Sequence, residues 1–462
     1  MRASIVAEKA GVRSVSLVAS GFVKQARAIA QALGVQDLAI AEYPGVIMTD
    51  KEADFQRKIE AMADQVVEGL AAPVRAAPRK TEPGPRDIVF TGTLDGVHEF
   101  FLKNLWTDGL PVVPPTVERV EEFLRFTDRS PDDVLGVLLP EKREATVWNV
   151  AVNGVMAGCR PEYMPILIAA VEAISTPEFR IEDGGSTPGW EPLIILNGPI
   201  ARELDFNSGQ GAMRVGRQAN TSIGRFLRLY WRNVAGLRIP PGATDKGTIA
   251  LSFNVVLAEN EEAVAEAGWQ PFSVDRGFRA GDNVVTVQSM VSISSPIYCG
   301  GDKPEELART LAEVFGRDTC GYWSFTGMRD QWFPLLVMSP SIAKALARGG
   351  WTKANLQRYL YDNAKIPAGM AERYAWQTGL THFSIKRLVE DGTLPKEFHE
   401  SDDPNRLVRV FMHPEWTGIV IAGDPDRNQC RGYVNNHKQG PPVSRKVELP
   451  ARWTQLLKER RK

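Results

Sequence analysis

The residues best suited to chemistry gather between positions 192 and 233. The apolar run PLIILN ends at Asn197, a glycine-rich loop follows, and the loop leads into IGRFLRLYWRN, which has helical spacing. A strand, a glycine loop and a helix N-terminus in this order present backbone N–H groups to an anion. We therefore expect a site for a small anion or carboxylate, formed by Asn197, Gly209, Gly211, Arg217, Asn220 and Arg225. The alternative is a structural loop with glycine turns.

Two standard nucleotide motifs are not supported in this loop. The spacing GxxxxG from Gly211 matches a P-loop, but Arg217 and Gln218 stand where Lys and Ser/Thr would bind phosphate and Mg²⁺. The dinucleotide pattern GxGxxG does not occur in the loop. These departures argue against Mg-nucleotide chemistry and against a dinucleotide cofactor.

Cys159 is the leading candidate for a nucleophile. It lies in the turn GCRP, just before the predicted helix EYMPILIAAVEAIS, and Arg160 follows it directly. A helix N-terminus and a guanidinium both favour the thiolate, so we expect a pKa below about 8.5 and the most reactive of the four thiols. Asn153 could donate a hydrogen bond to a developing oxyanion. The alternatives are a core cysteine and an asparagine that satisfies buried backbone.

Glu259 is the candidate for acid–base work. It stands with Glu261 and Glu262 at the end of an apolar run, and a buried carboxylate in such a group can transfer protons. A solvated helix start is the alternative, because EEAVAEAG has helical character. Arg276, in the loop between two β-rich runs, is counted with the substrate-binding residues. Cys299 is a weaker thiol candidate.

The composition argues against several classes of function. Net charge is −1, with 43% hydrophobic and 24% charged residues, which gives no indication of nucleic-acid or anionic-membrane binding. No apolar run approaches the roughly 20 residues of a membrane-spanning helix. The four cysteines form no CxxC pair and the five histidines no HxH or HExxH pattern, so we expect neither a disulfide framework nor a protein-built metal site. With no signal-peptide pattern, a reducing cytoplasm is the expected compartment.

The elements that must position these residues predict an α/β protein. Residues 13–70 read as two βα units, which is half of a doubly wound domain with about two parallel strands. Two strands are not stable alone, so another segment or another polypeptide must complete the sheet. Residues 71–86, rich in Ala, Pro and Arg, are a predicted linker. Residues 87–462 then form a large mixed α/β domain that carries the expected site.

A family resemblance rests on several stretches of the sequence. The run EKAGVRSVSLVASGFVKQARAIAQALGVQDLAIAEYPGVIMTD resembles the second half of a UGSC-type (seleno)protein domain. In that family a Sec/Cys-Gly-Ser-Cys turn precedes the corresponding strand, and this sequence lacks that turn. The later chain resembles the large region fused to, or encoded beside, such domains; the stretches include TDGLPVVPPT, REATVWNVAVNGVMAGCRPEYMP, NGPI, QANTSIGR, LAENEE and VDRGFRAGDNVVTV.

The resemblance implies a fold related to the selenoprotein subunits of glycine-type reductases, and a small partner subunit that carries the missing half-domain. With the residues above, it leads us to expect the large subunit of a hetero-oligomeric lyase or reductase. Such an enzyme would cleave a small, anionic organic substrate by thiol-assisted or acid–base chemistry. The alternative is a non-catalytic scaffold that positions a thiol-bearing partner. A pocket joining residues 153–160 to 209–225 would favour catalysis, and separate packed cores would favour the scaffold. The sequence does not identify a cofactor.

Overall fold

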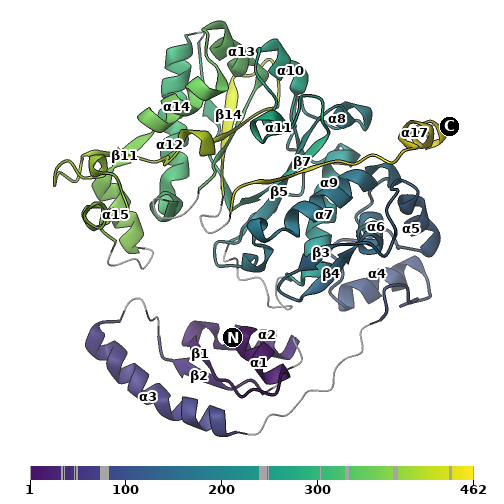
Figure 1. Cartoon of the computed structure of the whole chain (residues 1–462), viewed down its shortest axis with the longest axis vertical. Coiled ribbons are helices and arrows are strands. Elements are labelled where there is room, and N and C mark those ends of the chain that lie inside the picture. The colour runs from purple at the N-terminus through teal and green to yellow at the C-terminus, as the bar shows by residue number, and fades with distance from the viewer. Residues whose placement is uncertain are drawn as a thin grey trace. The chain divides into compact units, whose positions relative to one another are not determined.

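The computed structural model describes residues 2–32, 35, 37–45, 47, 50–72, 83–238, 247, 249–301, 303–327, 332–377, 383–435 and 440–460. The chain forms two compact units (Figure 1). The N-terminal unit consists chiefly of Met1–Val89, and the large unit of Phe90–Leu237, Gly247–Tyr374 and Ser384–Lys462. Most of the predicted linker 71–86 lies outside the described residues, and the helix end expected at Gly34 does too.

The N-terminal unit contains the two predicted βα units. Strands β1 (Ser16–Ala19) and β2 (Ile40–Tyr43) pair in parallel, with Leu17 opposite Ala41, and form a two-stranded sheet. Its helices are α1 (Arg2–Lys9), α2 (Val23–Ala32) and α3 (Glu52–Ala71). The prediction of two parallel strands is confirmed, whereas α1 was not expected.

Two small apolar cores hold the N-terminal unit together. Ile5 of α1 packs with Ala30 of α2 in the first. In the second, Met62 of α3 packs with Ala41 and Tyr43 of β2. The expected apolar stripe of α3 is therefore buried at Met62, while Ile59 and Leu70, at its margins, remain exposed. Each core is small, so the unit buries little apolar surface of its own.

The large unit begins its core with the predicted strand PLIILN. It lies in β5 (Glu191–Asn197), the centre of a four-stranded sheet of order β15-β7-β5-β6. Every residue of β5 is buried, as expected for a continuous apolar strand covered on both faces. β7 (Val284–Met290) runs antiparallel to β5 and to β15 (Val443–Lys446), while β6 (Leu257–Ala258) runs parallel to β5.

A second sheet contains β13 (Gly418–Ile421), β10 (Leu335–Met338), β14 (Gln429–Val434) and β8 (Ser292–Ile293) in that order. The short strand β9 (Ile297–Tyr298) also pairs with β14. β10 is parallel to β13 and antiparallel to β14, so this sheet is mixed as well. Both sheets agree with the predicted α/β class.

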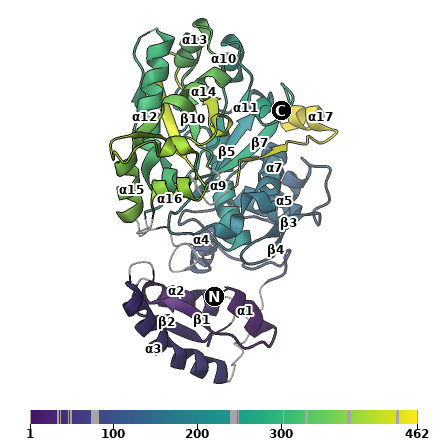
Figure 2. The same cartoon turned by 60° about the vertical axis from the view of Figure 1, so that its left-hand side comes forward.

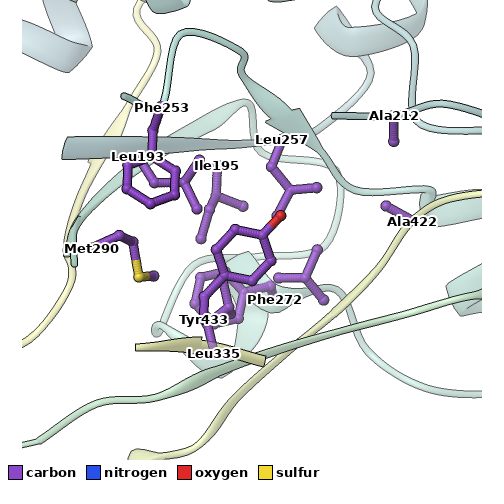
Figure 3. Close-up of a cluster of buried hydrophobic side chains, with 11 residues drawn as sticks. Leu193, Ile195, Ala212, Phe253, Leu257, Phe272, Met290, Leu335, Ala422 and Tyr433 are labelled. Atoms are coloured by element: carbon purple, nitrogen blue, oxygen red, sulfur yellow. The ribbon is translucent and has the colours of Figure 1, made fainter. Parts of the chain in front are cut away.

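One apolar core lies between the two sheets (Figure 3). Leu193 and Ile195 reach it from β5, and Leu335, Val420 and Tyr433 reach it from the strands of the second sheet. Because side chains alternate along a strand, the same strands present their remaining residues to the helices outside. The strands of both sheets are therefore covered on two faces, by the apolar core on one side and by helices on the other.

Helices cover the outer face of each sheet (Figures 1 and 2). α7 (Met164–Ile174) packs against β7 and β15, α9 (Gln218–Tyr230) against β5, and α12 (Pro304–Gly327) against β14. The large unit is thus built as four layers: helices, sheet, sheet and helices. Its other helices and strands are α4 (Leu94–Lys103), α5 (Val117–Leu124), β3 (Val134–Leu138), β4 (Arg143–Thr146), α6 (Val147–Met156), α8 (Ile200–Glu203), α10 (Glu261–Glu266), α11 (Phe272–Asp275), α13 (Pro340–Arg348), α14 (Lys353–Asn363), β11 (Lys365–Pro367), α15 (Ala368–Gln377), α16 (Ile385–Glu390), β12 (Leu407–Arg409) and α17 (Trp453–Arg460).

The sequence SPDDVLGVLLP predicts a short capped helix, and this prediction is wrong. SPDDVLGVLLP has a Ser-Pro start typical of a helix, but Val134–Leu138 form strand β3, which pairs antiparallel with β4. The pairing partner lies a few residues further on, and hairpin pairing overrides the capping signal. No helix in the described ranges combines the length and apolar character needed to cross a bilayer.

The close approach of α9 to the chain before β6 gives the first testable prediction. A Cβ at Gly224 would overlap the backbone carbonyl of Asn254 and lie 2.6 Å from the amide nitrogen of Val255. Alanine normally stabilises a helix by about 1 kcal/mol relative to glycine, but a backbone clash cannot be relieved by a side-chain rotation. We expect Gly224→Ala to lower the free energy of unfolding by at least about 1–3 kcal/mol in a urea titration.

Gly209→Ala is the matched control, because only the far end of Asn207 lies near its Cβ, at 3.8 Å, and its φ angle is not positive. This variant is expected to unfold within about 0.5 kcal/mol of the parent protein. Equal stability of the two variants would contradict the close packing of α9.

Candidate functional site

Cys159 lies at a junction of three segments of the large unit. It follows α6 through Gly158, whose φ of +77° makes the turn, and its N–H donates to the carbonyl of Gly154 at 3.0 Å. Its thiol is hydrogen-bonded to Ser222 of α9, and the charge of Arg225 lies nearby. Gln218 of α9 also donates to the carbonyl of Gly158 at 3.2 Å. The turn after α6 is therefore fastened to the start of α9.

The predicted low pKa of Cys159 is wrong. Its side chain is only 9% exposed, and burial raises the pKa of the thiol to about 12 although Ser222 and Arg225 oppose the rise. The two expected activating groups act elsewhere. Arg160 pairs with Glu162, and a short 3-10 turn, Pro161–Tyr163, separates Cys159 from the first residue of α7. Desolvation outweighs the nearby charges because the thiolate has lost its water.

Arg225 holds the segment TDGLPVVPPT against α9. Its guanidinium binds both carboxylate oxygens of Asp108, at 2.9 and 2.8 Å, and donates to the carbonyl of Pro111 at 2.9 Å. Burial alone would raise the pKa of Asp108, but the hydrogen bonds and charge of Arg225 hold it below its ordinary value. The fork geometry of arginine suits this bidentate pair. The guanidinium of Arg225 therefore binds groups of the protein itself, namely Asp108 and the carbonyl of Pro111, and does not stand open as an anion site.

Asn153 also has a structural partner. Its Nδ2 donates to the carbonyl of Asn149 at 2.9 Å, and its Oδ1 accepts from Asn233 at 2.9 Å. Asn233 in turn donates to the carbonyl of Trp106, just before the segment held by Arg225. Through Asn233, which lies in the helical turn Trp231–Ala235 after α9, the side chain thus connects α6 with the segment before Asp108. Its use as an oxyanion donor stays a prediction.

The glycine loop is organised by asparagines. The Oδ1 of Asn220 accepts from the N–H of Asn207 at 2.8 Å, and its Nδ2 donates to the carbonyls of Asn207 and Val256. The N–H of Gly209 donates to Asn207 Oδ1 at 3.0 Å, and Gly211 turns the chain with a φ of +71°. Asn220 is a residue type that often caps a helix, which predicts a helix start near it, but α9 starts at Gln218 and Asn220 lies inside the helix.

Arg217 is separated from these residues. Its side chain is 56% exposed and pairs with the exposed Asp205 at 2.7 Å. An exposed pair of this kind contributes little to stability. The structure therefore brings Cys159 and Arg225 together around Ser222, brings Gly209, Gly211 and Asn220 together in the loop, and leaves Arg217 at the surface. These residues do not surround one described cavity, and ligand binding by them stays a prediction.

Glu259 lies in a separate, fully buried cluster of polar groups. Its carboxylate accepts hydrogen bonds from Asn197 Nδ2 at 2.7 Å, from the N–H of Phe272 at 2.6 Å and from the N–H of Ile421 at 3.2 Å. Nζ of Lys353 lies 3.9 Å from Glu259 Oε1. Burial raises the pKa of Glu259, and these four groups oppose the rise. Asn197 orients this carboxylate, and its use in substrate binding stays a prediction.

Lys353 connects this cluster of polar groups to a side chain nearer the surface. Its Nζ binds Asp275 Oδ2 at 2.9 Å, and the side chain of Asp275 is one-third exposed. Burial raises the pKa of Asp275, opposed by Lys353. The predicted substrate-binding residue Arg276 follows, but its guanidinium donates to the carbonyl of Pro442 at 2.9 Å. Neither Lys353 nor Asp108 was singled out from the sequence, because neither stands in a recognisable motif.

Two pockets of the described structure lie away from all these residues. One, of about 390 Å³, opens along α14 and is lined by Trp351, Asn355, Arg358 and Tyr359 among others. The other, of about 80 Å³, lies between α7 and the C-terminal segment, near Arg129 and Glu172. None of the predicted site residues lines either pocket. Within the described ranges, no group of three or more His, Cys, Asp or Glu side chains is placed to hold a metal ion.

The fold and these clusters define an α/β protein whose chemistry-bearing side chains are largely engaged with each other. Comparison with known proteins adds one finding: residues 1–72 match the family model described as the UGSC family. The N-terminal region is therefore similar to that family, as the sequence predicted. No curated protein and no solved structure matches the chain. The likeness of residues 87–462 to the region encoded beside such domains stays a prediction.

The burial of Cys159 predicts low reactivity. With the thiol enclosed and its pKa raised to about 12, iodoacetamide near neutral pH should leave Cys159 unmodified in the native protein. The same reagent should modify it fully after unfolding in urea, which serves as the control. Peptide mapping by mass spectrometry makes the measurement. Rapid native labelling of Cys159 would restore the nucleophile hypothesis.

The Asp108–Arg225 pair predicts a pH-dependent contribution to stability. Asp108→Asn leaves the largely buried guanidinium without its carboxylate, and we expect a loss of about 1.5–3 kcal/mol at neutral pH by urea unfolding. The pKa of Asp108 is lower in the folded state, so its contribution is present above the ordinary carboxyl pKa and is lost as pH falls through the folded value. The difference between the parent and the variant should therefore shrink in acid.

Asp205→Asn is the matched control, since it breaks an aspartate–arginine pair that is exposed on both sides. It should change the free energy of unfolding by less than about 0.5 kcal/mol at any pH. Equal effects of the two substitutions would show that Arg225 does not need its buried partner.

Proposed function

We propose that this chain is the large, partner-positioning subunit of a hetero-oligomeric enzyme. In this proposal its N-terminal unit receives a second polypeptide, and that polypeptide supplies the reacting thiol. The assembly would carry out lyase- or reductase-type cleavage of a small organic substrate, as the family resemblance implies. The observation that carries the proposal is the outer edge of β1.

β1 pairs with β2 and with no other strand among the residues that the structure describes. Its free edge therefore presents backbone N–H and C=O groups that a further strand can bind. Leu17 lies beside this edge and is 64% exposed. Its neighbour in register, Ala41 of β2, is fully buried with Met62 of α3. Helix α3 thus covers β2 and leaves the same face of β1 open.

A strand added next to β1 would extend the parallel sheet and cover Leu17. Fully burying a leucine side chain contributes about 1.5–3 kcal/mol, so this position can contribute materially to binding. The match of residues 1–72 to the UGSC family supports the choice of partner, because the resemblance implies a Cys-Gly-Ser-Cys turn next to the strand that corresponds to β1. The complementary half-domain would bring such a turn next to β1.

The state of the residues in the large unit favours positioning over catalysis by this chain. Cys159 is buried with a raised pKa, Asn153 is bonded to two asparagines, and Glu259 is enclosed by four donors. A nucleophile or general base must reach the substrate atom on which it acts. These side chains are instead committed to internal contacts, which suits a rigid platform.

Leu17→Glu tests the proposal. The probe is the purified polypeptide encoded immediately upstream of this chain, mixed with the full-length protein and analysed by size exclusion with mass measurement. We expect a complex with the parent protein, and binding weakened at least tenfold, about 1.4 kcal/mol, by the buried carboxylate. The variant should fold normally, because the substituted side chain is exposed in the free chain.

Val215→Glu is the matched control: this valine is 70% exposed but belongs to the large unit, so binding should be unchanged. Separate elution of the two parent polypeptides would refute the proposed partner. A complex that Leu17→Glu and Val215→Glu affect equally would move the interface away from β1.

A further inference from the structure

Two cysteines far apart in the sequence meet at the edge of the second sheet. β9 pairs antiparallel with β14, with Ile297 opposite Cys430 and Tyr298 opposite Gln429. The N–H of Cys299, the next residue, donates to the carbonyl of Asn428 at 3.4 Å. Since side chains alternate along a strand, Cys299 lies on the same face as Ile297 and therefore diagonal to Cys430. The two thiols lie close enough for each to shift the pKa of the other.

The pair is enclosed but lies directly beneath the surface. Cys299 and Cys430 are each 1% exposed, whereas Tyr298, on the opposite face of β9, is 70% exposed. Gly300 and Gly301 follow Cys299 and are both exposed. A Cβ added at either glycine would meet no atom within 4 Å, so no side chain packs over these two residues. For a reagent to reach Cys299, the chain next to it would have to move outward.

We propose that Cys299 and Cys430 form a redox-active dithiol, which closes to an intramolecular disulfide when the protein meets a low-molecular-weight disulfide. This site lies in the large unit and does not depend on the partner proposed for the N-terminal unit. It assigns to the two thiols a reaction in place of simple core packing.

The exchange proceeds in two steps that balance. The thiolate of Cys299 attacks one sulfur of the small disulfide, breaks its S–S bond and releases one small thiolate, which takes up a proton. Cys430 then loses its proton to water or a basic group and attacks the sulfur of Cys299, so that the second small thiolate leaves. The two protein thiols are oxidised by two electrons, and the small disulfide is reduced to two thiols.

The environments of the two sulfurs fit this order. The hydrogen bond from Cys430 lowers the pKa of Cys299, while burial raises the pKa of Cys430 well above its ordinary value. A lower pKa and a position next to the surface are the features of an attacking thiol. Cys430 is wholly enclosed and in the second step needs to reach only Cys299, once its proton has left.

The geometry requires a small closing movement. Diagonal neighbours across an antiparallel pair have Cα atoms about 7–8 Å apart, and a disulfide needs about 4.4–6.8 Å. Closure therefore draws the end of β9 inward by roughly an ångström. Gly300 and Gly301 follow immediately, and glycine has the backbone freedom to take up such a shift. The resulting bond would fasten β9 to β14 at the edge of the sheet.

The test uses the purified full-length chain, fully reduced and then equilibrated with mixtures of oxidised and reduced glutathione at neutral pH. After acid quenching and unfolding, we expect the number of free thiols to fall from four to two. Peptide mapping should find one cross-link, between Cys299 and Cys430, and dithiothreitol should reverse it.

Single substitutions establish the roles of the two thiols. Cys430→Ser should retain a glutathione adduct on Cys299, because the second step is blocked, and Cys299→Ser should leave Cys430 unmodified. Cys159→Ser is the matched control and should still lose two thiols. Circular dichroism confirms that each variant is folded.

Four free thiols at every glutathione ratio that oxidises a small exposed dithiol would overturn the proposal. So would a cross-link that forms only in urea, or one that joins Cys299 or Cys430 to another cysteine. An adduct on Cys430 in the Cys299→Ser variant, as strong as that on Cys299 in Cys430→Ser, would refute the assigned order.

Discussion

The large unit depends on the burial of one carboxylate. An ionised group in an apolar interior is costly unless donors surround it. Glu259 meets this requirement through Asn197 at the end of β5, the N–H of Phe272 in α11 and the N–H of Ile421 in β13. The N–H of the next residue, Asn260, also donates to the carbonyl of Ile421. The ends of the two sheets are thereby held together, and the apolar core between them has a defined width.

The same principle explains why residue types associated with catalysis serve structure here. Arg225, Asn153 and Asn220 are polar side chains in a densely packed layer of helices, so each must find partners within the protein. They find them in backbone carbonyls, amides and one carboxylate, that of Asp108. The segments on either side of α6 and α9 are fixed in place as a result. A thiol in this layer, Cys159, loses its water and with it the stabilisation of its charged form.

The N-terminal unit presents the opposite situation, in which too little is enclosed. Among the described residues, two strands and their helices bury two small groups of side chains, and Leu17 stays open beside a strand edge that no described strand covers. Sheets of this kind are normally covered on both faces and extended by further strands. In the large unit the polar side chains described above bind partners within the protein, whereas in the N-terminal unit Leu17 and the edge of β1 stay open. This contrast is the physical reason to look for association at β1.

Several features followed from the sequence alone. The unbroken apolar run PLIILN, with its short length and flanking turn residues, is typical of a strand covered on both faces. The alternation of apolar runs with helical stripes in residues 13–70 predicts parallel βα units, and both are local patterns. Other outcomes depended on contacts between distant segments. Hairpin pairing decided that Val134–Leu138 is a strand, burial decided the pKa of Cys159, and strand register placed Cys299 beside Cys430. Desolvation and register are set by neighbours that no local window of sequence contains, so only the tertiary structure could decide them.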